Sequence, residues 1–225
     1  MLIFQAGLIL IYPDLNGDKM DTEKLKKGAD AVLDRLINAM RGAGGEIHPQ
    51  SLVCAVGSLA GYACQKDVRV IYMKQRGFPE DKIFTVMTDK SGRKVFFGDL
   101  LNEPLVNDKY SVWSMIGGAV KQRGGSLPDV NDIFRYISYV VGGEQFGKAR
   151  ACETGDDMKT YLSQLWKPLN EIATQYAEDG ELHIVYGIAL QRAVYAAGES
   201  MNVTEAARIA MESAVSMSKV DFNSL

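Results

Sequence analysis

IHPQSLVCAVGSLAGYACQ, residues 47–65, is the stretch of sequence that decides the fold. Small residues dominate it, and it carries no formal charge when its histidine is neutral. Pro49 suits the first turn of a helix, where the missing N–H costs nothing. On a helix, four small residues share one face because they fall at i, i+3, i+4 and i+7: Cys54, Gly57, Ser58 and Gly61. Each interior glycine costs about 0.5–1 kcal/mol relative to alanine, so the pair predicts close approach by another helix.

Apolar residues recur at helical spacing on both sides of this stretch. We expect further helices at residues 22–41, 109–123, 127–141, 155–178, 182–197 and 203–219. Capping patterns precede four of them, with these expected N-caps: Asp108, Ser126, Thr154 and Asn202. The last two helices also carry small-residue faces, which makes them the expected partners of the helix that starts at Pro49.

The clearest β signal is the pair of segments at residues 83–88 and 94–97, which are rich in β-branched and aromatic residues. The link between them contains Gly92 and turn-forming residues, so we predict a β-hairpin at residues 83–98. Residues 68–73 alternate as a strand does, yet the preceding helix could simply continue through them. The sequence therefore leaves open whether the hairpin joins a small sheet with residues 68–73 and the N-terminal stretch.

These patterns predict one α+β domain over residues 1–225 that is predominantly helical. Its simplest form is a helical bundle of about seven helices decorated by the hairpin. Length and composition agree, since 225 residues with 47% hydrophobic and 24% charged content are ordinary for one packed domain.

Charge and cysteine content indicate which partners and compartment to expect. A net charge of −3 and a pI near 5.5 provide no basic footprint for nucleic acid. Cys54 and Cys64 would lie roughly 15 Å apart on a continuous helix, beyond the roughly 7 Å that a disulfide allows. We therefore expect a protein of the reducing cytoplasm.

Two apolar segments are short for crossing a membrane. Residues 1–12 are apolar except for Gln5, and residues 52–64 form the other candidate. A spanning helix needs about 20 apolar residues, so membrane insertion is not expected. Peripheral membrane association through residues 1–12 is a third hypothesis, behind the two given below.

No motif assigns chemistry. The sequence has no phosphate-binding loop of the Walker type, nucleophile elbow, zinc-type spacing or dinucleotide fingerprint, so we predict no cofactor and no metal. Glu153, Asp156 and Asp157 are carboxylates at a predicted helix start, and we interpret them as capping residues. Cys152 precedes the same helix start and would have a lowered pKa there, although no base is identifiable nearby.

Three residues are the candidate binding residues. His48 and His183 are the only histidines, and both rings would reach one site if their helices pack together. Gln191 is an amide within an apolar helix and must find a partner if it is buried. Gln65 is a second such amide, and the two would either bond each other or line a pocket.

Two functions follow as hypotheses. The first is self-association or binding of a protein partner, most simply as a homodimer through an apolar helical face, because C2 dimers are the commonest oligomers. The alternative is a small-molecule-binding protein or enzyme with a pocket between helices near His48 and His183.

Overall fold

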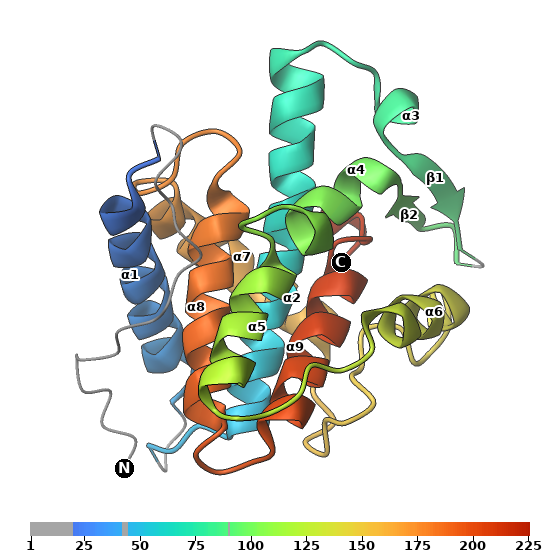
Figure 1. Ribbon diagram of the computed structural model, residues 1–225. Helices are drawn as coiled ribbons and strands as arrows, with labels where there is room; N and C mark the ends of the chain where they lie inside the picture. Colours follow the sequence, from blue (N-terminus) through green and yellow to red (C-terminus); the bar gives the residue numbers. More distant parts are fainter. Residues whose placement is uncertain (1–19, 42–44, 90) are drawn as a thin grey trace.

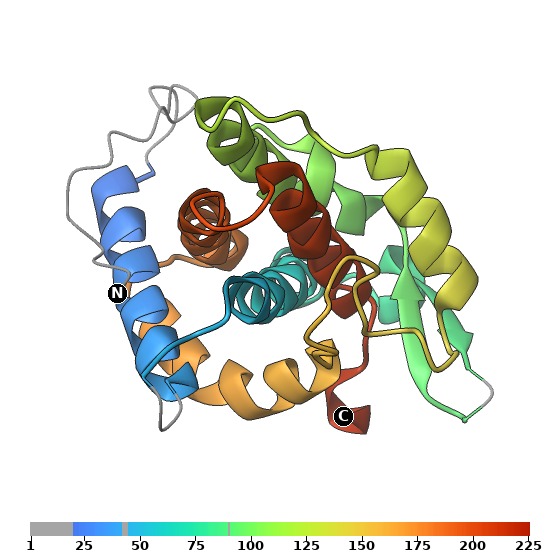
Figure 2. The ribbon, with the colours of Figure 1, turned by 90° about the horizontal axis from the view of Figure 1, so that it is seen from below.

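Helix α2 (Pro49–Val68) lies at the centre of the computed structural model, which describes residues 20–41, 45–89 and 91–225. Seen from below in Figure 2, other helices surround α2. They are α1 (Thr22–Met40), α7 (Met158–Ala173), α8 (Leu182–Ala197) and α9 (Val203–Met217). Every side chain of residues 52–65 is buried. This central position explains why the stretch has no polar face.

The small-residue face of α2 packs against the backbone of α9, as predicted. A Cβ atom added at Gly61 would lie 1.9 Å from the carbonyl oxygen of Ala214. One added at Gly57 would lie 2.8 Å from the carbonyl oxygen of Ala210. The two glycines thus let the helix axes approach to a distance that no side chain would permit. This small-residue face is buried against α9 of the same chain, so it does not form a surface for another subunit.

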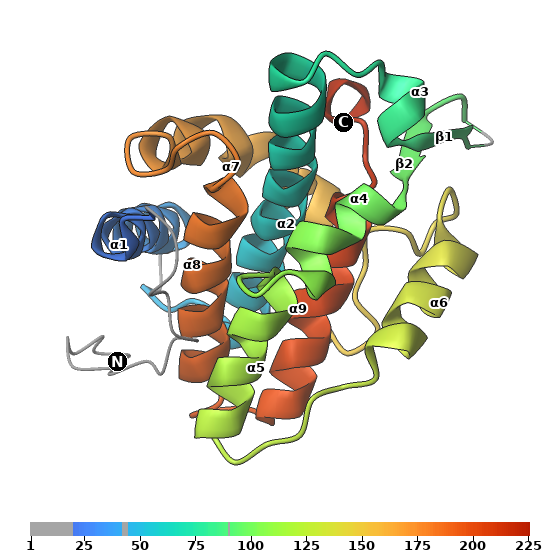
Figure 3. The ribbon, with the colours of Figure 1, turned by 45° about the horizontal axis from the view of Figure 1, so that its top comes forward.

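All seven expected helices are present in the part of the chain that the structure describes, and the fold is a predominantly helical α+β domain. Besides the five above, they are α5 (Val112–Gln122), which packs on α8, and α6 (Val130–Val140), which packs on α9. Figure 3 shows α2, α5, α8 and α9 side by side, with α6 at the edge of this group.

The predicted hairpin is confirmed. Strands β1 (Thr85–Thr88) and β2 (Lys94–Phe97) are antiparallel, with Val86 opposite Phe96. Short helices flank the hairpin, namely α3 (Glu80–Ile83), α4 (Asp99–Asn102) and a π-helical turn at Glu103–Asn107. Figure 1 shows the hairpin at the periphery, on the side of α6 and far from α1. A final 3-10 turn spans Phe222–Ser224.

Residues 68–73 are helical, which decides the alternative that the sequence left open. Helix α2 continues as a π-helix at Arg69–Gln75, and this continuation rises beyond the ends of α8 and α9 in Figure 1. Arg69 Nε donates to Gln65 Oε1 at 3.3 Å, a contact between side chains one helical turn apart. The hairpin instead gains a backbone bridge between Val95 and Val220. Residues 1–12 lie outside the described residues.

Three helices begin later than predicted. Asn202 is the N-cap of α9 as expected, and it accepts from the N–H groups of Thr204 and Glu205. The observed N-caps of α5, α6 and α7 are Ser111, Asp129 and Asp157. The expected residues have other partners: Ser126 is hydrogen bonded to Thr204, and the Thr154 hydroxyl is bonded to Asp156. Helix α7 also ends earlier, at Ala173, where the Thr174 hydroxyl bonds the Asn170 carbonyl oxygen at 2.9 Å.

Candidate functional site

The two histidines lie at opposite ends of α2. His48 is the exposed N-cap of α2, whereas His183 is buried at the first turn of α8 and contacts Asp67 at the last turn of α2. Helices α2 and α8 do pack together, but they run antiparallel. The histidines are therefore separated by the length of α2, roughly 30 Å at 1.5 Å per residue. The structure does not bring both rings to one site.

Asp67 and His183 form a buried pair that caps α8. Asp67 Oδ2 accepts the backbone N–H of His183 at 2.8 Å and lies 2.7 Å from the ring Nδ1. A carboxylate at the positive end of a helix is favourable, and here it comes from a different helix. The pair explains His183 as a residue that joins the end of α2 to the start of α8.

We expect Asp67→Ala to lower the free energy of unfolding by about 2–3 kcal/mol, because it leaves a buried N–H and a buried ring nitrogen without their acceptor. Urea-induced unfolding followed by circular dichroism measures this difference. Asp67→Asn is the matched control, since its amide oxygen keeps one acceptor and is expected to cost less. Equal stability of wild type and Asp67→Ala would contradict the capping role.

Gln65 and Gln191 do not bond each other. Gln65 Nε2 donates to the carbonyl oxygens of Ser218 at 2.8 Å and Val220 at 3.0 Å, which ties the chain after α9 to α2. Gln191 is buried in α8, and its Oε1 has no hydrogen-bond partner among the described residues. Gln65 is thus a structural residue, whereas Gln191 is a buried polar group whose carbonyl oxygen is open to a partner.

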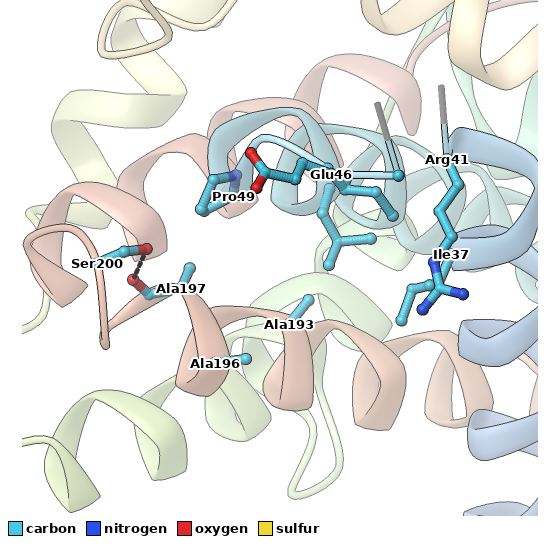
Figure 4. Close-up of a pocket in the computed structure, with 11 residues that line it drawn as sticks. Ile37, Arg41, Glu46, Pro49, Ala193, Ala196, Ala197 and Ser200 are labelled. Carbon is cyan, nitrogen blue, oxygen red and sulfur yellow. Dashed lines mark hydrogen bonds between the residues drawn. The ribbon is translucent and has the colours of Figure 1, made fainter. Parts of the chain in front are cut away.

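A pocket of about 350 Å³ lies between the end of α1, the start of α2 and the end of α8 (Figure 4). Its floor is apolar, with Leu52 and Ala193 among the lining residues, and Arg41 and Glu46 bring opposite charges to it. The neighbours of His48 in sequence line this pocket. The described lining residues include neither histidine and not Gln191. The volume falls in the range of small-molecule sites.

A second group of side chains gathers where α2 begins, and we call it the thiol cluster. It consists of Tyr161 on α7 and three residues of the segment before α7, Cys152, Thr154 and Asp156, which hydrogen bonds join. Cys152 Sγ lies 3.0 Å from Thr154 Oγ1 and 3.5 Å from Asp156 Oδ2. The Tyr161 hydroxyl donates to Asp156 Oδ1 at 2.7 Å. Cys152 is thus surrounded by groups able to donate or accept hydrogen bonds.

Cys152 of the cluster and Cys54 on α2 have opposite pKa shifts. The neighbouring Cys54 thiol, together with the Thr154 hydroxyl, lowers the pKa of Cys152 to about 6, although partial burial and the Asp156 charge oppose the shift. The interaction with Cys152, and then burial, raise the pKa of Cys54 well above its usual value. The interaction thus shifts the two pKa values in opposite directions, down for Cys152 and up for Cys54.

The segment that carries Cys152 is anchored to two helices. Glu212 on α9 is completely buried and accepts the backbone N–H of Arg150 at 2.7 Å and its Nε at 2.6 Å. The backbone N–H of Glu153 donates to Gln50 Oε1 on α2 at 3.0 Å. These contacts hold the thiol of Cys152 against the start of α2.

The acidic residues near Cys152 have structural partners. Asp157 caps α7 by accepting the backbone N–H of Lys159 at 3.0 Å, as the capping interpretation requires. Asp156 instead accepts from the hydroxyls of Thr154 and Tyr161. Within residues 20–41, 45–89 and 91–225, no group of three histidine, cysteine or acidic side chains is arranged to hold a metal ion.

The sequence placed Cys152 just before a helix start, but it gave no indication that Cys54 would affect the pKa of Cys152. These cysteines are far apart in the chain, and no local pattern relates them. The one relevant feature of the sequence is that Cys54 belongs to the small-residue face of α2, close to the N-terminus of that helix.

The fold and these sites define a helical α+β domain with an apolar pocket and a half-buried cysteine beside the Asp156 carboxylate. No protein family model, curated protein or solved structure matches the chain. None of the helices in the described ranges has both the length and the apolar character needed to cross a bilayer.

Proposed function

We propose that the protein acts by self-association, as a homodimer joined through the outer edge of strand β1. The small-residue face of α2 is used inside the chain, so an interface must lie elsewhere. Strand β1 is the outer strand of the two-stranded sheet, since β2 lies between it and the bridge to Val220. Its hydrogen-bonding edge is the observation that carries the proposal.

The ladder fixes which backbone groups of β1 point outward. Asp89 N donates to Arg93 O at 2.8 Å, so Asp89 and, by alternation, Met87 face β2. On the far side of β2, Phe96 N donates to Lys219 O at 2.9 Å, so Phe96 and its partner Val86 do not bond each other. Val86 and Thr88 therefore direct their N–H and C=O groups away from the sheet. Within the described part of the chain, these groups have no backbone partner.

A second copy of the chain fits this edge. The strand Thr85-Val86-Met87-Thr88 is uncharged and nearly symmetrical in sequence. With a twofold axis at Met87, antiparallel pairing places Val86 opposite the partner's Thr88, so both outward-facing pairs bond across the interface. Val86 and Met87 are 37% and 54% exposed. Edge strands of monomers usually carry a charge, a proline or a bulge that blocks such pairing.

Val86→Pro tests the proposal. Proline removes the outward N–H of residue 86, while the bonds between β1 and β2 do not involve that group. We expect wild type to have the mass of a dimer by native mass spectrometry and light scattering, and Val86→Pro to have the mass of a monomer with an unchanged circular dichroism spectrum. Val86→Thr, which keeps the N–H, is the matched control and is expected to dimerise. A monomeric wild type, or a dimeric Val86→Pro, would refute the proposal.

The second candidate function is small-molecule binding in the pocket of Figure 4. Its volume, apolar floor and opposed charges at Arg41 and Glu46 favour this candidate. The sequence predicted a pocket between helices near His48 and His183. The observed pocket also lies between helices, at the end of the bundle that carries His48 and away from His183. The same native mass spectrum tests it, because a bound molecule adds a discrete mass that is lost on denaturation.

A cytoplasmic location is part of the proposal. Its support is the state of the cysteines, since Cys54, Cys64 and Cys152 are all free thiols. Free thiols persist in a reducing compartment.

A further inference from the structure

We infer that a second pocket, formed where the end of the chain packs on α2, binds a free amino acid with an aromatic side chain. We call it the C-terminal pocket. Its volume is about 410 Å³, and it is lined by residues of α2 and its π-helical continuation, α3, β2, α7 and the turn after α9. Figure 3 shows the end of the chain beside the upper part of α2. The pocket of Figure 4 lies at the other end of α2.

Two charged side chains of the C-terminal pocket lack a partner of opposite charge. Lys66 on α2 and Asp221 after α9 both line the pocket, and both are partly buried. Within the described ranges, the Lys66 ammonium forms no hydrogen bond or ion pair. Asp221 Oδ1 accepts the backbone N–H of Asn223 at 3.1 Å, whereas Oδ2 has no described partner. A partly buried charge without a partner gives up hydration and gains nothing in return.

The other charges of the pocket are already engaged with one another. Arg69 Nη1 lies 2.5 Å from Glu80 Oε1, and Lys94 Nζ lies 3.9 Å from Glu80 Oε2. The Arg69 guanidinium also stacks over the ring of Phe96, 4.4 Å from its centroid. These contacts form one wall of the pocket, and they leave Lys66 and Asp221 as the charges open to a ligand.

Opposite charges that line one pocket without pairing call for a ligand that carries both signs. In a free amino acid, the ammonium and carboxylate groups are attached to the same carbon atom, so one molecule can lie between Lys66 and Asp221. A phosphate or a dicarboxylate would pair with Lys66, but Asp221 and Glu80 would repel it. A simple amine would pair with Asp221 and leave Lys66 without a partner.

Aromatic rings form the opposite wall of the pocket. The ring of Tyr62 stacks on Phe222 with 5.2 Å between centroids, and it meets Trp166 edge-on at 4.6 Å. Burial raises the pKa of the Tyr62 hydroxyl to about 12, so this wall has no charge of its own at neutral pH. An aromatic side chain gains from offset or edge-on contacts with such rings. This wall therefore favours an aromatic amino acid over a polar one.

The pocket is held in shape by contacts within the chain. Gln65 Nε2 donates to the carbonyl oxygens of Ser218 at 2.8 Å and Val220 at 3.0 Å. These two bonds fix the segment that carries Asp221 to the helix that carries Lys66. A site whose charged groups are already in place loses little ordering free energy when a ligand binds.

The test is titration of the full chain with L-phenylalanine and with two analogues that each lack one charge. They are 3-phenylpropionate, which has no ammonium group, and phenethylamine, which has no carboxylate. We expect isothermal titration calorimetry to show binding of L-phenylalanine, and each analogue to bind more weakly by roughly tenfold or more, since each loses one charged contact. This comparison uses the wild type alone, so it does not depend on how well any variant folds.

Four variants locate the binding to the C-terminal pocket. Lys66→Met and Asp221→Asn each remove one charge, and the asparagine keeps an oxygen for the Asn223 N–H. Each is expected to weaken binding of L-phenylalanine by roughly tenfold or more. Lys82→Met and Asp81→Asn, at exposed residues of α3 that do not line the pocket, are the matched controls and are expected to bind as wild type.

Tryptophan fluorescence gives an independent readout of the same pocket. The chain has two tryptophans, so Trp113→Phe leaves Trp166 as the single reporter. We expect its emission to change on titration with L-phenylalanine, because Trp166 lines the pocket. A ligand in the pocket of Figure 4 would leave this emission unchanged.

Three results would overturn the inference. They are a wild type that does not bind L-phenylalanine at up to about 10 mM, an analogue with one charge that binds as tightly as L-phenylalanine, and binding that neither Lys66→Met nor Asp221→Asn weakens. The described lining residues of the pocket include none of β1, so failure here leaves the dimer proposal standing, and the reverse also holds.

Discussion

Gly61→Ala is expected to lower the free energy of unfolding by about 3 kcal/mol or more. The added Cβ would lie 1.9 Å from the carbonyl oxygen of Ala214 and 2.7 Å from its Cα. These are backbone atoms in the last turn of α9, so relief requires this end of the helix to move away from α2. The gain in helix propensity from replacing glycine by alanine, about 1 kcal/mol, is smaller than the packing cost. Urea-induced unfolding followed by circular dichroism measures the difference.

Gly117→Ala is the matched control for this substitution. Gly117 is also a helical glycine, in α5, but a Cβ there would meet only Leu127 Cδ1 at an ordinary 3.5 Å. We expect it to leave stability unchanged or to raise it by up to about 1 kcal/mol through helix propensity. If the two variants were equally stable, the contact between α2 and α9 would not be as close as described.

Arg150→Met is expected to cost about 3–5 kcal/mol, because it leaves the buried Glu212 carboxylate without its charged partner. The Arg150 guanidinium lies 2.6 Å from Glu212 Oε1 and 2.8 Å from Asp132 Oδ2, and it stacks over the ring of Tyr136 at 4.1 Å. Among the described residues, only the backbone N–H of residue 150 would still donate to the carboxylate. The same unfolding measurement detects this loss.

Two further variants separate charge burial from general disruption. Arg208→Met removes a more exposed ion pair, 3.6 Å from Asp132, and is expected to cost less than about 1 kcal/mol. Arg150→Met combined with Glu212→Leu removes both charges and is expected to recover part of the stability that Arg150→Met loses. A double variant less stable than Arg150→Met would show that the cost comes from the arginine contacts and not from the stranded carboxylate.

Local patterns in the sequence predicted most of the secondary structure and one of the main contacts. Apolar periodicity located the seven longer helices, and the β-branched residues located the hairpin. The glycines of α2 predicted a close helix contact, because a helix face without side chains lets another helix approach its backbone. Helix starts were predicted less well, since Ser126 and Thr154 have hydrogen-bond partners outside their expected helices.

The candidate sites depended on contacts that no local pattern contains. The prediction of a shared site for His48 and His183 required α2 and α8 to run parallel, whereas they run antiparallel. Periodicity gives the buried face of a helix, but it does not give the direction of its neighbour. For the same reason, the sequence did not predict the contact between Asp67 and His183.

The central position of α2 has a consequence for biosynthesis. Its closest partners, α8 and α9, are the last two long helices of the chain, so more than half of the protein must leave the ribosome after α2 before α2 can be covered. During that interval the apolar surface of residues 49–65 is exposed and open to wrong contacts, including contacts with other nascent chains. Burial of α2 therefore waits for the synthesis of α8 and α9. Protection of α2 by a chaperone would act over the interval between the synthesis of residue 68 and that of residue 217.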